Sequence, residues 1–358
     1  MTRATSAFLD LLRLAAAFTV FLAHTAHYWN PSLVDSMQVV AHDAVILFFV
    51  LSGYVIACTT KEKCQSARDY AVARLSRLYS VVVPALLLTA VLWPLGSQLD
   101  PGLYAHYARS GGAVRYLLTF LHLNEIWFFD AYPPSNTPFW SLGYEASYYV
   151  LFGLFWFVKR SLWRWLLLTA CAFAIGPKVL LLLPAWLAGV FAQLFSDRWR
   201  MNRVTAIALF FVFGAWLIAA IRWMRDWPYP MGVEPWYFSN AAGTDLIKSV
   251  GWAGLIWAFS RGFGGAVVPG RMHRVVRWSA NHTFSLYLYH APLVIFATAL
   301  VPPIGRDLTV GISVVGAILL VIIGLAALTE GQRRHWQTLF AWIFRKATWQ
   351  RSGSPAKA

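Results

Sequence analysis

Long apolar runs, bounded by charged residues or by Pro and Gly, recur along the whole chain and restrict its fold more than any other feature. Hydrophobic residues make up 59% of the 358 positions, and charged residues only 13%. An ordinary soluble domain is about half apolar and a quarter charged. Because about 20 apolar residues suffice to cross a bilayer as a helix, we predict an all-α polytopic membrane protein.

The apolar runs define about ten transmembrane helices. They are residues 8–28, 39–58, 78–96, 138–158, 163–177, 179–196, 204–221, 245–260, 280–300 and 309–329. The fifth and sixth are short and are separated only by Gly176-Pro177-Lys178, so they form a hairpin or a kinked pair. Segment 114–130 is apolar but interrupted by polar residues, and we predict an interfacial or re-entrant piece there.

The basic residues indicate the orientation in the membrane. Most of the 30 Lys and Arg residues fall on one side of this ten-span arrangement, which favours an N-in and C-in topology. The net charge of +15 is therefore a topology signal. A nucleic-acid partner would need a basic face on a soluble domain, and the sequence predicts none. We expect the protein to contact the lipid bilayer instead.

We predict one membrane domain over residues 1–345 and a short basic cytoplasmic tail, expected to be disordered, over residues 346–358. The first apolar run has no small-residue cleavage site and is expected to be a retained helix. The three cysteines, Cys58, Cys64 and Cys171, are odd in number and lack metal-ligand spacing. We therefore expect neither a disulfide nor a metal site.

Two ionisable residues, Arg13 and His24, share the first predicted span with ten residues between them. At about 1.5 Å per residue they lie roughly 16 Å apart along the helix axis. Ionisable groups are costly in hydrocarbon and are therefore candidates for function. The structural alternative is that Arg13 extends to an interface and His24 makes a local polar contact.

Other polar groups lie near the ends of the second and third predicted spans. Ser52 and Gly53 form a small-residue pair near the end of the second span, which allows close approach of a helix or a ligand; packing is the favoured interpretation. Arg74 and Arg77 share one helix face at the start of the third span. They are either positive-inside anchors or an anion site suited to the phosphates of a nucleotide-like donor.

Later spans add further candidates. Ser141 and Glu145 open the fourth span, where a carboxylate needs an ion-pair partner or water. His290 falls near mid-membrane in the ninth span. Glu330 closes the tenth span beside Arg333 and Arg334, which are its candidate partners. One shared interior site would explain why all these groups lie within spans or at their ends.

These blocks together resemble the acyltransferase-3 family of integral membrane acyltransferases. The resemblance covers nearly the full length and rests on the order and spacing of six sequence elements. They are Leu9-Asp10…Arg13-Leu14-Ala15…His24, Phe48-Phe49-Val50-Leu51-Ser52-Gly53-Tyr54, Arg74…Arg77-Leu78-Tyr79, Trp140-Ser141-Leu142…Glu145…Tyr148-Tyr149, Ser285-Leu286-Tyr287-Leu288-Tyr289-His290-Ala291-Pro292, and Glu330. The chain departs from the usual family pattern at Ala44, Ile46, Ser80 and Gly331, so the resemblance assigns no subgroup.

The resemblance implies O-acylation of cell-surface glycans, glycolipids or related acceptors, with acyl-CoA, most often acetyl-CoA, as donor and no tightly bound cofactor. It implies a bacterial inner membrane location. It also implies that Arg13 and His24 form the family's Arg-ten-residues-His motif with His24 as the leading catalytic candidate. Arg74 or Arg77 and Glu330 would then act at the cytoplasmic end of the site.

The expected mechanism divides the work across the membrane. Arginines bind the phosphates of cytoplasmic acyl-CoA, and neutral His24 acts as general base on an acceptor hydroxyl from the outer side. Glu145 is expected to orient the imidazole of His24. A covalent acyl-enzyme remains open, and so does a proton-coupled transporter that uses the same His, Glu and Arg groups.

Overall fold

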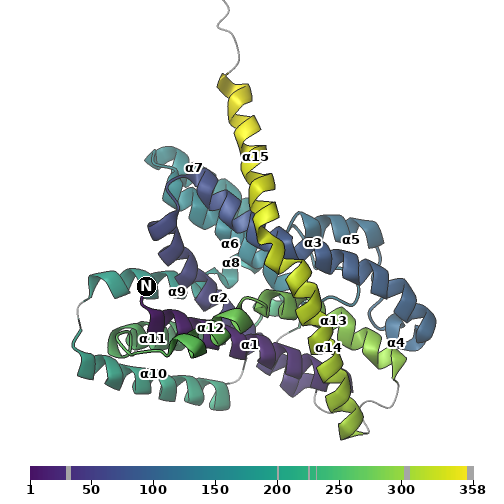
Figure 1. Cartoon of the computed structure of the whole chain (residues 1–358). Helices are drawn as coiled ribbons and strands as arrows, with labels where there is room; N and C mark the ends of the chain where they lie inside the picture. The colour runs from purple at the N-terminus through teal and green to yellow at the C-terminus, as the bar shows by residue number, and fades with distance from the viewer. Residues whose placement is uncertain (30–33, 200, 225, 231, 302–306, 353–358) are drawn as a thin grey trace, which may run out of the picture.

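The computed structural model describes residues 1–29, 34–199, 201–224, 226–230, 232–301 and 307–352, and over these residues it contains helices and turns but no strand (Figure 1). The first nine helices are α1 (Arg3–Trp29), α2 (Val34–Lys63), α3 (Ala67–Leu99), α4 (Pro101–Ala105), α5 (Gly112–Phe120), α6 (Phe139–Phe157), α7 (Ser161–Ile175), α8 (Pro177–Leu181) and α9 (Leu183–Arg198). The others are α10 (Arg203–Trp223), α11 (Ala242–Gly262), α12 (Gly270–Ala280), α13 (Thr283–Leu300), α14 (Leu308–Leu328) and α15 (Arg333–Ser352), with 3₁₀ turns η2 (Tyr237–Ser239) and η4 (Glu330–Gln332).

Within the described residues, six helical segments are long and apolar enough to cross a membrane. They are Arg3–Ala26, Met37–Lys63, Ala67–Leu99, Arg203–Trp223, Thr283–Leu300 and Thr309–Arg345. Helices α7 and α9 are apolar but shorter. Each of the ten segments predicted from sequence falls mainly on helix, with 179–196 divided between α8 and α9 and 280–300 beginning at the end of α12. A polytopic all-α protein is confirmed, whereas the count of ten spans and the N-in, C-in orientation stay predictions.

Local sequence signals explain several helix ends. Ser66 and Asp69 form a reciprocal capping box at the start of α3, and the Asp100 side chain accepts a hydrogen bond from Leu103 N at the start of α4. Asn202 caps α10 in the same way through Thr205 N. These caps satisfy backbone donors that a helix leaves unpaired in its first turn.

The Ser52-Gly53 pair lies where α2 crosses α9. A Cβ atom on Gly53 would lie 2.1 Å from the carbonyl oxygen of Trp186, and one on Gly189 would lie 1.9 Å from that of Val50. Only glycine allows two backbones to approach this closely. The close approach brings Trp186 Nε1 to 3.2 Å from Ser52 Oγ, so the glycines position a residue of the site described below.

The centre of the bundle is formed by α1, α2, α3, α6 and α13. Helix α1 packs against α2, α12 and α13, while α13 also packs against α3. In Figure 1, α1 crosses the middle of the molecule with α2 and α12 beside it. Fully buried aromatic side chains fill this centre, among them Phe21, Tyr144 and Tyr289. Residues far apart in sequence are thus held in one rigid packing unit.

The structure adds detail to two segments, 114–130 and the C-terminal end of the chain. Of segment 114–130, only the part in the nine-residue α5 is helical, and this helix is too short to span a bilayer. Helix α15 continues to Ser352, past the position at Arg345 where disorder was expected. Its rings Trp336 and Phe340 pack against Tyr79 of α3 at centroid distances of 6.2 and 5.5 Å, which stabilises its first turns.

Candidate functional site

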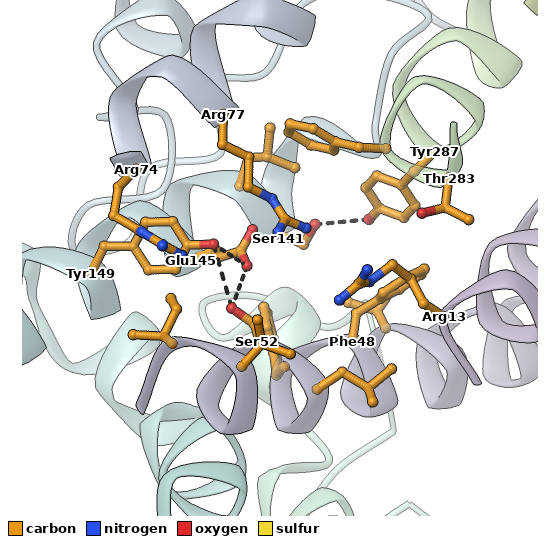
Figure 2. Close-up of a pocket in the computed structure, with 17 residues that line it drawn as sticks. Arg13, Phe48, Ser52, Arg74, Arg77, Ser141, Glu145, Tyr149, Thr283 and Tyr287 are labelled. Atoms are coloured by element: carbon orange, nitrogen blue, oxygen red, sulfur yellow. Dashed lines mark hydrogen bonds between the residues drawn. The ribbon is translucent and has the colours of Figure 1, made fainter. Parts of the chain in front are cut away.

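A cavity of about 60 Å³, here called the central cavity, lies between α1, α2, α3, α6 and α13. Figure 2 shows Arg13, Arg74, Arg77 and Glu145 pointing into it from α1, α3 and α6. The cavity is also lined by Ser52, Ser141, Tyr149, Thr283 and Tyr287. Three guanidinium groups and one carboxylate therefore share a site with a net positive charge.

Glu145 is held by two hydroxyl groups in the central cavity. Ser52 Oγ and Tyr149 Oη each donate a hydrogen bond of 2.5 Å to the same carboxylate oxygen, Glu145 Oε1. Trp186 Nε1 in turn donates to Ser52 Oγ. The carboxylate is thus fixed by a polar network within the helix bundle, and such networks hold side chains in one geometry when their members are paired.

The arginines of the central cavity are anchored less tightly. Arg13 Nη1 donates to Asp10 Oδ1 at 3.3 Å, and Arg74 Nη2 lies 3.4 Å from Thr59 Oγ1. Arg74 is 8% exposed, and its Nε has no hydrogen-bond partner among the described residues. A buried guanidinium with an unpaired donor is suited to an anionic ligand.

A wider cavity of about 450 Å³, the cationic vestibule, adjoins the central cavity on one side. It is lined by Arg13, Arg77, Ser80, Trp278, Ala280, Asn281, His282, Thr283, Glu330, Gly331 and Arg333. Glu330 accepts hydrogen bonds from the Ser285 amide at 3.2 Å and from the Ser285 hydroxyl at 2.8 Å. Its hydrogen-bond partner is therefore Ser285 on α13, in place of the arginines expected from sequence.

A third cavity of about 60 Å³, the histidine cavity, is lined by Val20, His24, Gln38, Ala41, His42, Val45, Trp140 and Tyr287. His24 Nδ1 lies 2.8 Å from His290 Nε2, and the two rings stack at a centroid distance of 5.0 Å. His290 is fully buried, and its Nδ1 lies 3.0 Å from the carbonyl oxygen of Leu286. Because that oxygen only accepts, Nδ1 of His290 carries a proton.

The tautomers of the neutral pair follow from that contact. With its proton on Nδ1, His290 accepts at Nε2, so His24 donates from its own Nδ1. The lone pair of His24 is then on Nε2. The contact with His290 thus fixes the tautomer of His24.

Shared lining residues connect the three cavities into one row. Arg13 and Arg77 line both the cationic vestibule and the central cavity, while Val45 and Tyr287 line both the central cavity and the histidine cavity. The row leads from the arginines to His24 through the interior of the bundle. Ser141 contributes to its middle by a 2.8 Å hydrogen bond to Tyr287.

The structure thus places every residue singled out from the sequence in or beside this row. Besides the partner of Glu330, one further expected contact differs. Glu145 was expected to orient His24, but it accepts its hydrogen bonds from Ser52 and Tyr149 in the central cavity, whereas His24 lines the next cavity and is hydrogen-bonded to His290. The reason is the position of His290, which reaches His24 from α13.

Two side-chain pairs near the histidine cavity were not predicted from the sequence. His42 pairs with Asp245 at 3.0 Å, and Asp43 pairs with Lys248 at 2.5 Å. All four residues lie inside predicted spans, 39–58 and 245–260. The cost of ionisable groups in hydrocarbon, which pointed to Arg13 and His24, therefore applies equally to them.

Among the described residues, no group of three or more His, Cys, Asp or Glu side chains could hold a metal ion. The row carries cationic guanidinium groups at one end and imidazoles at the other. Such an arrangement can bind an anionic molecule in one cavity and accept a proton in another.

The fold and this row of cavities define an integral membrane protein with an interior polar site. The model of the family Acyl_transf_3, an acyltransferase domain, matches residues 6–330, and the chain belongs to this family. No curated protein and no solved structure matches it. The protein is therefore a membrane acyltransferase.

Proposed function

We propose that the protein transfers an acyl group, in the first place acetyl, from cytoplasmic acyl-CoA to a hydroxyl of an extracytoplasmic glycan or glycolipid. The observation that supports this proposal is the row of cavities from the arginines to His24. A transferase that takes its donor from one side of a membrane and its acceptor from the other needs neighbouring cavities inside the bundle. Family membership favours this reaction over proton-coupled transport.

The donor phosphates bind at the cationic vestibule in this proposal. Arg13, Arg77 and Arg333 line it, and guanidinium groups bind phosphate oxygens in a bidentate manner. The vestibule offers about 450 Å³, whereas the central cavity offers about 60 Å³. The nucleotide part of acyl-CoA therefore stays in the vestibule, and only its thin acylated arm enters the central cavity.

His24 acts as the general base at the far end. Its Nε2 takes the proton of the acceptor hydroxyl while the hydroxyl oxygen attacks the thioester carbonyl. The tetrahedral intermediate then expels the thiolate, so that a C–O bond forms and the C–S bond breaks. The thiolate takes up the proton that His24 Nε2 had accepted, which returns His24 to its neutral form, and the products are the acyl ester and coenzyme A.

The proposed sides of the membrane follow from the basic residues, which favour the arginine end as cytoplasmic. A bacterial inner membrane suits this arrangement, because acyl-CoA is made in the cytoplasm and surface glycans are exposed on the opposite side. The acceptor would then enter the histidine cavity from outside.

The test uses the purified full chain in proteoliposomes with radiolabelled acetyl-CoA and a panel of cell-envelope glycans and glycolipids. We expect base-labile label in an acceptor with the wild type and none with His24→Ala. Both proteins should bind coenzyme A equally, because His24 does not line the vestibule. Undiminished transfer by His24→Ala would refute the role of the base, and the absence of transfer by the wild type would refute the reaction.

A further inference from the structure

A second histidine, His42, lines the histidine cavity together with His24 and has no part in the reaction described above. It lies on α2 and is 6% exposed. Its ring is nearly parallel to that of Trp140, with 5.9 Å between centroids and 13° between planes. His42 is therefore held in a fixed orientation at the wall of a cavity assigned to the acceptor.

Asp245 of α11 determines which nitrogen of His42 carries the proton. His42 Nε2 lies 3.0 Å from Asp245 Oδ2, and Asp245 is 1% exposed. A carboxylate accepts hydrogen bonds, so Nε2 of neutral His42 carries the proton and Nδ1 carries the lone pair. The acceptor nitrogen of His42 is thus set by a buried carboxylate.

The Nδ1 atom of His42 is buried and has no hydrogen-bond partner among the residues that the structure describes. Leaving a buried acceptor unpaired costs free energy, and such atoms in native proteins call for a ligand or water. This unpaired atom belongs to a side chain that lines the same cavity as His24.

We propose that the His42–Asp245 pair binds the acceptor substrate, with Nδ1 of His42 accepting a hydrogen bond from a second hydroxyl beside the one that is acylated. A hydroxyl has one proton, so the group deprotonated by His24 cannot also donate to His42. The acceptor is consequently a polyol with neighbouring hydroxyls. This inference rests on the proposed acyl transfer and adds a specificity-determining residue to it.

The size of the histidine cavity agrees with this assignment. Its volume of about 60 Å³ holds a few water-sized groups, which suits the hydroxyl-bearing edge of a sugar ring and not a whole sugar. Two imidazoles that line so small a space can contact neighbouring hydroxyls of one molecule at the same time.

A purely structural role for His42 would depend on a different ring nitrogen from substrate binding. The neighbouring pair Asp43–Lys248 also joins α2 to α11, and His42–Asp245 could serve as a second tie of that kind. Such a tie uses only Nε2 of His42, whereas acceptor binding uses Nδ1. The two roles therefore depend on different atoms of one side chain.

Substitution of His42 by Asn or Gln distinguishes the roles of the two ring nitrogens. The amide of Asn reaches the position of Nδ1, and the amide of Gln reaches that of Nε2. The experiment measures label transfer from acetyl-CoA to an envelope glycolipid extract, titrated by its carbohydrate content, with purified full-length His42→Asn and His42→Gln in proteoliposomes. We expect His42→Gln to raise the apparent KM for the extract between about three- and tenfold and His42→Asn to raise it less. The KM for acetyl-CoA should not change with either variant.

The reverse order, with His42→Gln closer to wild type, would identify a structural tie and overturn the proposal. If His42→Asn leaves Asp245 unpaired and fails to fold, the same comparison is made with Asp245→Asn added to both variants. The matched control is His122→Asn. His122 is also buried with an unpaired ring nitrogen, but it lines none of the three cavities.

Two small probes test the second hydroxyl directly. We expect cis-cyclohexane-1,2-diol to inhibit labelling of the extract by the wild type at lower concentration than cyclohexanol, and this difference to disappear in His42→Gln. Equal inhibition of the wild type by both probes overturns the proposal. A wild type that labels no acceptor refutes the acyl transfer itself, whereas normal labelling with unchanged KM in His42→Gln refutes only the role of His42.

Discussion

His24 on α1 and His290 on α13 are joined by a direct hydrogen bond of 2.8 Å between Nδ1 and Nε2. The residues are 266 positions apart in the chain, so only the packing of α13 against α1 brings them together. The Leu286 carbonyl fixes the proton of His290, and His290 thereby directs the lone pair of His24 to Nε2. Which nitrogen of His24 carries the proton consequently depends on a residue that lies outside its own helix.

Substitution of His290 tests this dependence. His290→Leu removes the acceptor for His24 Nδ1–H, so His24 loses its preferred tautomer, and we expect kcat for acyl transfer to fall by about 10- to 100-fold. His290→Gln can present an amide oxygen near the position of Nε2 and should lose less. The KM for acetyl-CoA should stay constant, and steady-state kinetics of label transfer measure both quantities.

His122→Leu is the matched control, because His122 is a buried histidine in the loop after α5 that lines none of the three cavities. Burial lowers the pKa of His122 to about 4, so it is neutral, and its removal should cost stability without a specific loss of kcat. Equal losses of kcat for His290→Leu and His290→Gln would contradict the tautomer argument.

Neutralisation of Arg77 should weaken donor binding. Arg77 lines both the cationic vestibule and the central cavity, so it contacts the donor along its path in the proposed reaction. We expect Arg77→Met to raise the KM for acetyl-CoA by roughly 10-fold or more, since a charge-assisted hydrogen bond contributes about 1.5–3 kcal/mol. Arg77→Lys keeps the charge but loses the bidentate geometry and should fall between.

The control for Arg77 is Arg203→Gln. Arg203 donates to the carbonyl oxygen of Gly262 at 3.1 Å and lines none of the three cavities. Isothermal titration with coenzyme A separates binding from turnover. A similar loss of affinity in both variants would mean that total positive charge, and not the position of Arg77, governs donor binding.

The sequence predicts the class of fold well because hydropathy has a direct physical meaning for a helix in a bilayer. Arg13, Ser52, Arg74, Arg77 and Glu145 were assigned to one interior site from their cost in hydrocarbon, and they line one cavity. That cost says nothing about partners, which explains why Glu145 was paired with His24 instead of with Ser52 and Tyr149.

Pairs of residues far apart in the sequence could not be predicted, because the cost of a polar group in hydrocarbon does not identify its partner. His24 with His290, Glu330 with Ser285, and His42 with Asp245 each join helices whose neighbourhood is decided by packing. Spacing along one helix predicts which side chains share a face, as for Arg74 and Arg77. It does not predict which face of another helix they meet.

Removal of the Glu145 charge should separate stability from donor binding. Glu145→Gln keeps the shape of the side chain but weakens the hydrogen bonds from Ser52 and Tyr149. We expect the free energy of unfolding to fall by about 1–3 kcal/mol. Coenzyme A affinity should not decrease, because the lost charge has the same sign as the donor phosphates.

Thermal unfolding in detergent and coenzyme A titration measure the two effects of Glu145→Gln. Ser52→Ala serves as its control, since it removes one donor to Glu145 and leaves the charge in place. A marked loss of coenzyme A affinity in Glu145→Gln alone would show that the carboxylate positions the arginines and does not merely accept hydrogen bonds from its neighbours.

The buried pair of Glu125 and Lys178 should support the fold without contributing to catalysis. Lys178 Nζ lies 2.6 Å from Glu125 Oε2, both side chains are at most 1% exposed, and Lys178 also donates to the carbonyl of Phe129. Neither residue lines any of the three cavities. Lys178→Met leaves a buried carboxylate unpaired, and we expect a loss of about 3–5 kcal/mol in the free energy of unfolding.

The double variant Glu125→Gln with Lys178→Met should recover much of that loss, because it removes both charges together. Denaturant-induced unfolding measures the free energy of unfolding of the wild type, of Lys178→Met and of the double variant. Any remaining folded enzyme should show wild-type KM values for donor and acceptor. A double variant as unstable as Lys178→Met would show that the main contribution of Lys178 is its hydrogen bond to the Phe129 carbonyl, and a changed KM would place the pair within reach of the substrate path.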